Sequence, residues 1–458
     1  MTAVMPVPGE DERLPMLLGF QPVAETTARR TRFIERGRGI YVYDSDGREY
    51  IEATSSFYVA ALGYQNAELI DAIEAQYRNL PFFVCAMHRT PRVAVELAEK
   101  LASLVPVLDA HVLFGSTGSE AIDFLLKMLR FQAAVRGTPA RTTVIGRWGS
   151  YHGSTLASAS LTGGHHEEFL LPLPGFRHVA QPDYHGHRLP GETPDAFCAR
   201  LARELEETIA REPAGTVAAF VAEPVSFSCG FKLPPSGYFP ALMPVLEAHG
   251  VQLVCDEVVN GFGRLGHWFG SQALDLAPDH VTCAKGITSG YFPLSAVALG
   301  KGLYADLERG SNAVGTLAHA ATYAAHPVGA AAALKTIEII ERDGLIARAK
   351  SMGERLRWRL QSLLGHPLVG EVRSLGLAAA VDFLKRDADD RPLQTEAQAD
   401  AICMEVYQAL LDLGVVARPA GRSLVLAPPL IVDPSEIDEI CSRLGRALNM
   451  VEAGLRGS

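Results

Sequence analysis

The chain has 458 residues, of which 48% are hydrophobic and 21% charged, and this globular profile predicts one large domain together with a smaller one. The formal net charge of −10 and the lack of basic runs with interleaved aromatics argue against nucleic acid or a membrane as a partner and favour small molecules. Seven widely spaced cysteines without a zinc spacing, no signal-like N-terminus and no apolar run of about 18 residues predict a cytoplasmic protein without a metal site.

The first predicted element is a hairpin, because "GIYVYDSDGREYIEA" has two alternating runs around the turn signal "DSDG". From about residue 91 to 320, helical patterns alternate with short apolar segments, namely "AHVLF", "TTVIG", "VAAFVAEP", "VQLVCDE", "HVTCAK" and "SAVALG". That alternation predicts an α/β fold whose mostly parallel sheet has helices on both faces. Long helices, further strands and a final helix follow, so we expect an N-terminal segment 1–65, a large ligand-binding domain 66–327 and a small α+β domain 328–458 that packs with the N-terminal segment.

Charged side chains follow three consecutive predicted strands. Glu223 ends "VAAFVAE", Asp256 and Glu257 end "VQLVCDE", and Lys285 ends "VTCAK". In open α/β sheets the ligand lies beyond the carboxyl ends of the strands. One such residue would be explained equally well by contact with water, whereas three in a row indicate a functional site.

Lys285 has the weakest explanation as a solvated charge. The other seven lysines, among them Lys232 in "GFKLPPSG", occur in amphipathic helical patterns or polar loops, where we expect them to face water. A lysine partly removed from water loses proton affinity and becomes a usable amine nucleophile, as a Schiff base requires. Asp256 complements it, because a carboxylate facing a pyridine nitrogen keeps pyridoxal phosphate (PLP) protonated as an electron sink.

A phosphate site is predicted at "FGSTGSEAIDF". Gly115 and Gly118 would let the backbone approach an anion, and a helix beginning near Ser119 would present free N–H groups to it. Thr117 to Glu120 also matches an ordinary helix capping box. Together with Lys285 and Asp256, the segment is better explained as a phosphate cradle.

The motif "GFGRLG" (261–266) matches the G-x-G-x-x-G fingerprint of dinucleotide-binding proteins. A helix should then open directly after it, yet "HWFGSQALDLAPDH" has no clear apolar period. We therefore interpret the motif as a flexible glycine-rich loop and give little weight to an NAD-dependent oxidoreductase.

Six ordered motifs, "GSTGSEA", "SYHGST", "VAEPV", "CDEVVNGFGRLG", "CAKGITSGYFPLSAV" and "TYAAHPVGAAAAL", resemble those of the class III (ω-) aminotransferases, which are PLP-dependent enzymes of fold type I. The resemblance extends from about residue 30 to 450. It implies a large domain with a mostly parallel seven-stranded sheet, a small domain built from both termini, and PLP as the cofactor. It also accounts for "GFGRLG", which in such enzymes follows the aspartate strand and binds no nucleotide.

The resemblance implies a role for each matching residue around the cofactor ring. Lys285 would form the Schiff base and Asp256 would meet the pyridinium nitrogen. Val258 would pack on one face of the ring and Tyr151 on the other, with Glu223 supporting the cofactor edge. An aromatic and an aliphatic face would hold the ring flat while its edges stay free for polar contacts.

At the phosphate, the resemblance implies that Gly118 and Ser119 bind one subunit's cofactor and that Thr322 reaches it from a second subunit. A homodimer with its active site at the subunit interface is therefore implied. Whether such dimers pair into tetramers stays open.

Arg418 is the expected partner of the acceptor's carboxylate, because arginine can donate two parallel hydrogen bonds and the position resembles the movable arginine of amine:pyruvate members. Arg422 is a rival for this role. Phe57 and Tyr58 match the place where such enzymes line the substrate pocket, which suggests an apolar or aromatic amine. Ala86 and Met87 stand where amine transaminases often carry aromatics, so the preferred amine stays open.

The implied activity is transfer of an amino group from an amine or ω-amino acid to an oxo acid, with pyruvate as the expected acceptor. 2-Oxoglutarate is the alternative acceptor. A PLP lyase, decarboxylase or racemase shares the fold and the early chemistry, and a ligand-binding protein with a degenerate site is a third possibility, which the intact Lys285 and Asp256 oppose.

Overall fold

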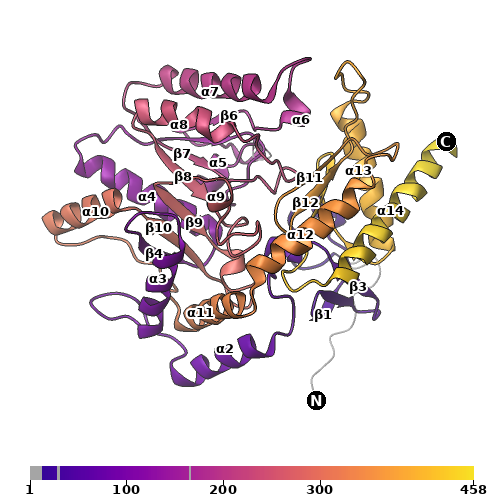
Figure 1. Ribbon diagram of the computed structural model, residues 1–458. Helices are drawn as coiled ribbons and strands as arrows, with labels where there is room; N and C mark the ends of the chain where they lie inside the picture. The colour runs from indigo at the N-terminus through magenta and orange to yellow at the C-terminus, as the bar shows by residue number, and fades with distance from the viewer. Residues whose placement is uncertain (1–12, 28–30, 165–166, 458) are drawn as a thin grey trace.

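The protein is described by a computed structural model that covers residues 13–27, 31–164 and 167–457 (Figure 1). Its largest sheet has seven strands in the order β4-β10-β9-β8-β7-β5-β6. The strands from β9 to β6 run parallel, and β10 is antiparallel to both of its neighbours. The bounds of the seven strands are β4 (His111–Gly115), β5 (Thr143–Arg147), β6 (Phe176–Val179), β7 (Val217–Ala222), β8 (Gln252–Asp256), β9 (His280–Cys283) and β10 (Ser295–Leu299).

The sheet alternates its side chains between two cores, as the period of a β-strand requires. On β8, Val254 packs into a cluster with α4 (Gly118–Val135) and α10 (Lys301–Val314). Leu253 and Cys255 point to the other face, into the core that includes α7 (Pro194–Arg211) and α8 (Tyr238–Ala248). The expected α/β fold with helices on both faces of a mostly parallel sheet is confirmed.

The N-terminal hairpin forms as predicted and pairs with the C-terminal part of the chain. Strands β1 (Ile34–Arg38), β2 (Tyr41–Asp44) and β3 (Glu49–Glu52) are antiparallel, and β13 (Val415–Val416) adds to β3 in parallel register. Residues 1–12 and 28–30 of the predicted N-terminal segment lie outside the described residues. The register places Ile51 opposite Val415, so two segments far apart in sequence share one sheet.

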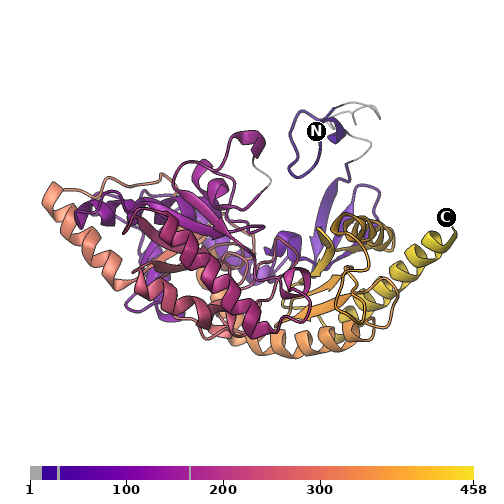
Figure 2. The ribbon, with the colours of Figure 1, turned by 90° about the horizontal axis from the view of Figure 1, so that it is seen from above.

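A third sheet, in the order β11-β12-β15-β14, lies beside the helices of the C-terminal part (Figure 1). Viewed from above, the molecule is a crescent, and the described residues 13–27 lie over its inner side (Figure 2). The strands of this third sheet and the helices beside it are β11 (Glu371–Ser374), β12 (Ala379–Asp382), β14 (Arg418–Ala420), β15 (Ser423–Leu426), α12 (Leu345–Gln361), α13 (Glu396–Asp412) and α14 (Pro434–Gly457).

The remaining elements are shorter or connect these layers, and none of the described helices is long and apolar enough to cross a membrane. They are η1 (Val23–Glu25), α1 (Ser55–Tyr58), α2 (Ala67–Asn79), α3 (Arg92–Leu104), α5 (Leu156–Leu161), η2 (Glu167–Phe169), α6 (Tyr184–His187), α9 (Gly270–Ala273), η3 (Lys285–Ile287) and α11 (Pro327–Arg342).

Candidate active site

The carboxyl ends of β7, β8 and β9 meet at one cavity of about 170 Å³. Because these strands are neighbours and parallel, the residues at or just beyond their ends, Glu223, Asp256 and Lys285, come together. Seven of the residues predicted for the cofactor site line this cavity, together with four that were not predicted for it. The lining is Gly118, Ser119, Tyr151, His152, Gly153, Glu223, Asp256, Val258, Val259, Ala284 and Lys285.

Lys285 begins η3 with a φ of 46°, a left-handed conformation that is uncommon for a residue with a side chain. The pKa of its amine is lowered to about 8. Burial is the main cause and the charge of Arg418 adds to it, while the charges of Asp256 and Glu223 oppose the shift. An amine with that pKa is unprotonated far more often at neutral pH than a solvated lysine. The environment therefore prepares Lys285 to act as a nucleophile or a base.

Asp256 is held by three hydrogen bonds, one of which comes from a histidine that the sequence reasoning missed. His152 Nδ1 lies 2.7 Å from Asp256 Oδ2, while Oδ1 accepts from Thr282 Oγ1 at 3.2 Å and from the Val258 N–H at 3.1 Å. His152 is buried, and within the described residues its Nε2 has no hydrogen-bond partner. Its place directly after Tyr151 in "SYHGS" does not by itself show that its side chain faces Asp256, 104 positions away.

The segment predicted as a phosphate cradle forms the N-terminus of α4, which begins at Gly118. A Cβ on Gly118 would lie 3.1 Å from both methyl groups of Val258, and a Cβ on Gly153 would lie 2.5 Å from Ser119 Oγ. The Glu120 N–H donates to Thr117 Oγ1, which is one of the two hydrogen bonds of the expected capping box. The other does not form, because the Glu120 carboxylate accepts from the Ser116 N–H and not from that of Thr117. The backbone therefore approaches the cavity closely enough for helix N–H groups to bind an anion.

Glu223 and Glu257, which follow neighbouring strands, have different surroundings. Glu223 lines the cavity and accepts hydrogen bonds from the Tyr151 N–H at 3.3 Å and from Ser226 Oγ at 3.1 Å. Glu257 faces away and accepts from the N–H groups of Gly270 and Ser271, which begin α9. Burial raises the pKa of both carboxyls, that of Glu257 to about 7. Glu257 is thus a helix cap and not part of the cavity.

The residues predicted for the substrate pocket form a second group beside the cavity. The Arg418 guanidinium lies 4.6 Å from the ring centroid of Phe57 and 5.6 Å from that of Tyr58. Lys285 Nζ lies 5.8 Å from the Tyr58 centroid, so Tyr58 links the two groups. Phe57 is half exposed, and Phe20, which sequence reasoning did not single out, lies 6.3 Å from the rings of both Phe57 and Tyr151.

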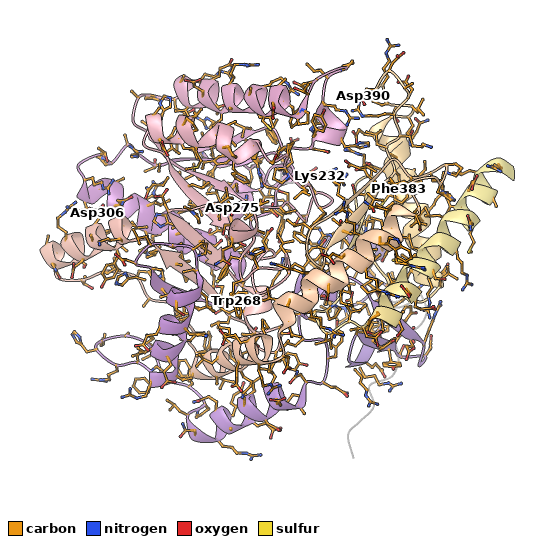
Figure 3. All side chains as sticks on the ribbon, in the orientation of Figure 1. Lys232, Trp268, Asp275, Asp306, Phe383 and Asp390 are labelled. Carbon is orange, nitrogen blue, oxygen red and sulfur yellow. The ribbon has the colours of Figure 1, made fainter. Side chains whose placement is uncertain are left out.

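Arg422, the rival of Arg418, belongs to a buried ion network. It donates to Asp183 Oδ2 at 2.6 Å and to Asp382 Oδ1 at 3.0 Å. The expectation that Lys232 faces water is wrong, because its amine lies 2.9 Å from Asp183 in the same network, between the large sheet and β12 (Figure 3). The loop-like sequence around Lys232 gave no sign of this, since both of its acids, Asp183 and Asp382, come from distant parts of the chain.

Three further predicted positions lie outside the cavity lining. Thr322 is exposed on the segment between α10 and α11, Met87 is 85% exposed, and Ala86 pairs only with Arg89 in an isolated bridge. This placement leaves Thr322 free to meet a second chain, as the sequence prediction requires.

The "GFGRLG" segment opens no helix, since turns and bends occupy residues 258–269 until α9 begins. A dinucleotide site of the fingerprint type is therefore absent from this segment. The loop is also not a mobile surface feature, because Arg264 within it is 3% exposed and donates to the carbonyl groups of Leu377 and Pro428.

Comparison with known proteins agrees with this geometry. The family profile described as aminotransferase class III matches residues 23–448. The chain is 36% identical over 449 residues to a putrescine–pyruvate aminotransferase of Pseudomonas aeruginosa, covering 97% of this chain and 96% of the relative. It is 38% identical over 434 residues to a diaminobutyrate–2-oxoglutarate transaminase of Halomonas elongata, covering 93% and 91%. The PMP-bound structure of an aminotransferase from Vibrio fluvialis has a TM-score of 0.92 and 38% identity, covering 96% of this chain and 97% of that one.

Proposed function

The chain belongs to the class III aminotransferase family, is a PLP-dependent enzyme of fold type I, and we propose that its donor is an amine or ω-amino acid and its acceptor pyruvate. The choice of acceptor rests on the name of the Pseudomonas relative, whereas the Halomonas relative is named for 2-oxoglutarate. A shared wall of Phe57, Tyr58 and Arg418 supports a pocket that accepts an apolar amine and then a carboxylate.

The donor groups of the cavity fit PLP. Among the described residues, Nε2 of His152 has no hydrogen-bond partner while Nδ1 contacts Asp256, and a Cβ on Gly118 or Gly153 would crowd Val258 or Ser119, so glycine is what lets the backbone come this close. When bound, PLP supplies an electron sink that stabilises negative charge at the substrate carbon that carries nitrogen.

We assign the proton and covalent chemistry to Lys285. Its amine, with a pKa of about 8, would hold the cofactor through its aldehyde group and, when free, would accept and return a proton at the substrate carbon that carries nitrogen. The Asp256 carboxylate would hold the pyridine nitrogen protonated. His152 fixes one oxygen of that carboxylate and Thr282 the other.

We assign the binding contacts to the other lining residues. Gly118 and Ser119 would bind the phosphate, Tyr151 and Val258 would pack against the ring, and Glu223 would support its edge, all from positions along one cavity. For the second half of the reaction, Arg418 would bind the carboxylate of the oxo acid through two hydrogen bonds.

We propose that the enzyme is a homodimer in which Thr322 completes the partner's phosphate site. Its exposed place between α10 and α11 supports this, as do the nearby apolar side chains Tyr323 and Phe82, which are 64% and 40% exposed. Large exposed apolar groups of this kind are typical of a surface that a partner covers.

We also propose a cytoplasmic location and the division into segments 1–65, 66–327 and 328–458. All seven cysteines are free thiols, which fits a reducing compartment. The pairing of β3 with β13 supports grouping the N-terminal segment with the C-terminal domain.

One observation carries the proposal: a buried lysine of lowered pKa shares a cavity with a hydrogen-bonded aspartate and a glycine-bounded helix N-terminus. The test uses purified enzyme with PLP, a panel of amines and ω-amino acids, and then pyruvate or 2-oxoglutarate separately. We expect amines to bleach the absorbance of the bound cofactor and pyruvate to restore it. Failure of every amine would refute aminotransfer from these donors, and restoration by 2-oxoglutarate alone would refute the acceptor.

A further inference from the structure

The backbone of α1 is left-handed throughout. Its four residues, Ser55 to Tyr58, have φ values of 53°, 50°, 57° and 71°, and none is glycine. The turn is nevertheless closed by hydrogen bonds from the Tyr58 N–H to the Thr54 carbonyl and from the Val59 N–H to the Ser55 carbonyl, both 2.7 Å. A left-handed turn of four residues with side chains persists only where surrounding contacts hold it.

One of these contacts is the buried carboxylate of Glu52, at the end of β3. Its Oε1 accepts from the Thr54 N–H at 2.9 Å and from Thr54 Oγ1 at 2.8 Å, and its Oε2 accepts from the Ser56 N–H at 2.7 Å. Burial raises the pKa of Glu52, and these same hydrogen bonds oppose the shift. Glu52 therefore links Thr54, which precedes the turn, to Ser56, the second residue of the turn.

The other contact is Arg264, the arginine of "GFGRLG". Its Nη2 donates to Ser55 Oγ at 3.0 Å, and Ser55 Oγ in turn donates to the Ala427 carbonyl at 2.6 Å. Its Nη1 donates to the carbonyl groups of Leu377 and Pro428. No carboxylate pairs with it in the described residues, so the guanidinium serves as a hydrogen-bond bridge between the turn and the two segments that flank the C-terminal sheet.

The turn positions the two aromatic side chains that line the proposed substrate pocket. Phe57 and Tyr58 are its last two residues, and both rings contact Arg418. Tyr58 also packs against Phe227, with centroids 5.0 Å apart. A change in the turn's dihedral angles would move both rings together, because no flexible residue separates them from Glu52 and Ser55.

We propose that Glu52 and Arg264 are positioning residues for substrate selection: they hold the left-handed turn 55–58 and thereby set the pocket wall that chooses among amines. This inference rests on the proposed aminotransferase function. It gives the arginine of "GFGRLG" a structural role in specificity and makes no use of nucleotide binding.

The experiment measures kcat/KM of the holoenzyme for propylamine, benzylamine and 1-phenylethylamine with one oxo acid. The variants are Glu52→Gln, which places an amide NH₂ among backbone donors, Arg264→Lys, and the milder Ser55→Ala, which removes only the bridging hydroxyl. We expect the ratio between the best and the poorest amine to fall about tenfold in each, because a mobile wall no longer favours one side chain. The absorbance spectrum of bound PLP should stay as in the wild type.

The matched control is Asp306→Asn. Asp306, on α10 at the far edge of the molecule (Figure 3), is a buried carboxylate like Glu52, but it accepts from Gln132 of α4 and from Arg136 at the end of α4. It should lower thermal stability without changing the amine ratio. The inference is overturned if the soluble variants keep the wild-type ratio while turnover of all three amines falls together. A wild type inactive with every amine would instead refute the proposed function.

Discussion

The cofactor end and the substrate end of the site are built in different ways. At the proposed cofactor end, Glu223, Asp256 and Lys285 lie at or just beyond the ends of three strands that are parallel neighbours in one sheet. At the substrate end, Phe57 and Arg418 are 361 positions apart in the sequence. The Arg418 guanidinium nevertheless lies 4.6 Å from the centroid of the Phe57 ring. The first group is placed by backbone pairing and the second by long-range side-chain contacts.

This difference predicts different consequences of substitution. In the proposed mechanism, residues at the cofactor end would act in both half-reactions, because the amine and the oxo acid use the same cofactor. Residues at the substrate end contact groups that differ between amine and oxo acid. Variants at the cofactor end should therefore slow both halves alike, and variants at the substrate end should slow them unequally.

The largest effect is expected for Lys285→Ala. The variant loses the covalent attachment and the proton-transfer group together, so turnover should fall by about 10⁴–10⁶-fold in both half-reactions. PLP should still bind through the cradle at Gly118 and the carboxylate of Asp256. Equilibrium dialysis would measure cofactor binding, and single-turnover absorbance would measure each half. Activity near that of the wild type would contradict the assignment.

Asp256→Asn is the next strongest test of the cofactor end. The amide cannot hold the pyridine nitrogen protonated, so both half-reactions should slow by about 10²–10³-fold. Thr282→Val is the matched control, because it removes only the 3.2 Å hydrogen bond to Asp256 Oδ1 and keeps the charge. Rapid-mixing absorbance would compare the two. Equal rates for Asp256→Asn and wild type would show that the carboxylate is only a charge at a strand end.

The cofactor end was largely predictable from the sequence, because strand-end position is a local property. A charged residue after an apolar run, as at Asp256 and Lys285, and glycines before a helix, as at Gly118, are visible without knowing which strands pair. Their arrangement around one cavity then follows from a parallel sheet. Even here, the partner of Asp256 was missed, since nothing local shows that His152 faces β8.

The substrate end and the ion network were not predictable in the same way. Lys232 looked solvated because its two acids, Asp183 and Asp382, come from other segments. The left-handed conformation of Ser55 to Tyr58 has no sequence signal, since glycine and asparagine, the usual residues there, are absent. Such features depend on tertiary contacts that a pattern of apolar residues does not encode.

Arg418→Ala tests the substrate end. Because Arg418 is only partly buried, the loss of oxo-acid binding should be near the lower limit for a charge pair that loses one partner, about 2 kcal/mol, or roughly 30-fold in Kd. Amine binding should change much less. Arg418→Lys keeps the charge without the bidentate geometry, so its Kd for the oxo acid should lie between those of the wild type and Arg418→Ala. Half-reactions measured separately would reveal the asymmetry, and equal weakening of both would indicate a general structural role.

The smallest effect joins the two ends through the pKa of Lys285. Covalent attachment of PLP to the apoenzyme requires the neutral amine, and with a pKa of about 8 the neutral fraction rises about tenfold between pH 7 and pH 9. The rate of reconstitution, followed by absorbance, should rise across that interval and then level. Arg418 lowers this pKa, so Arg418→Gln should move the midpoint to higher pH, whereas Arg78→Gln, an 81% exposed side chain, should leave it unchanged. An unshifted midpoint in Arg418→Gln would mean that the substrate end does not influence the nucleophile electrostatically, and would leave packing contacts, such as those of Tyr58, as the link between the two ends.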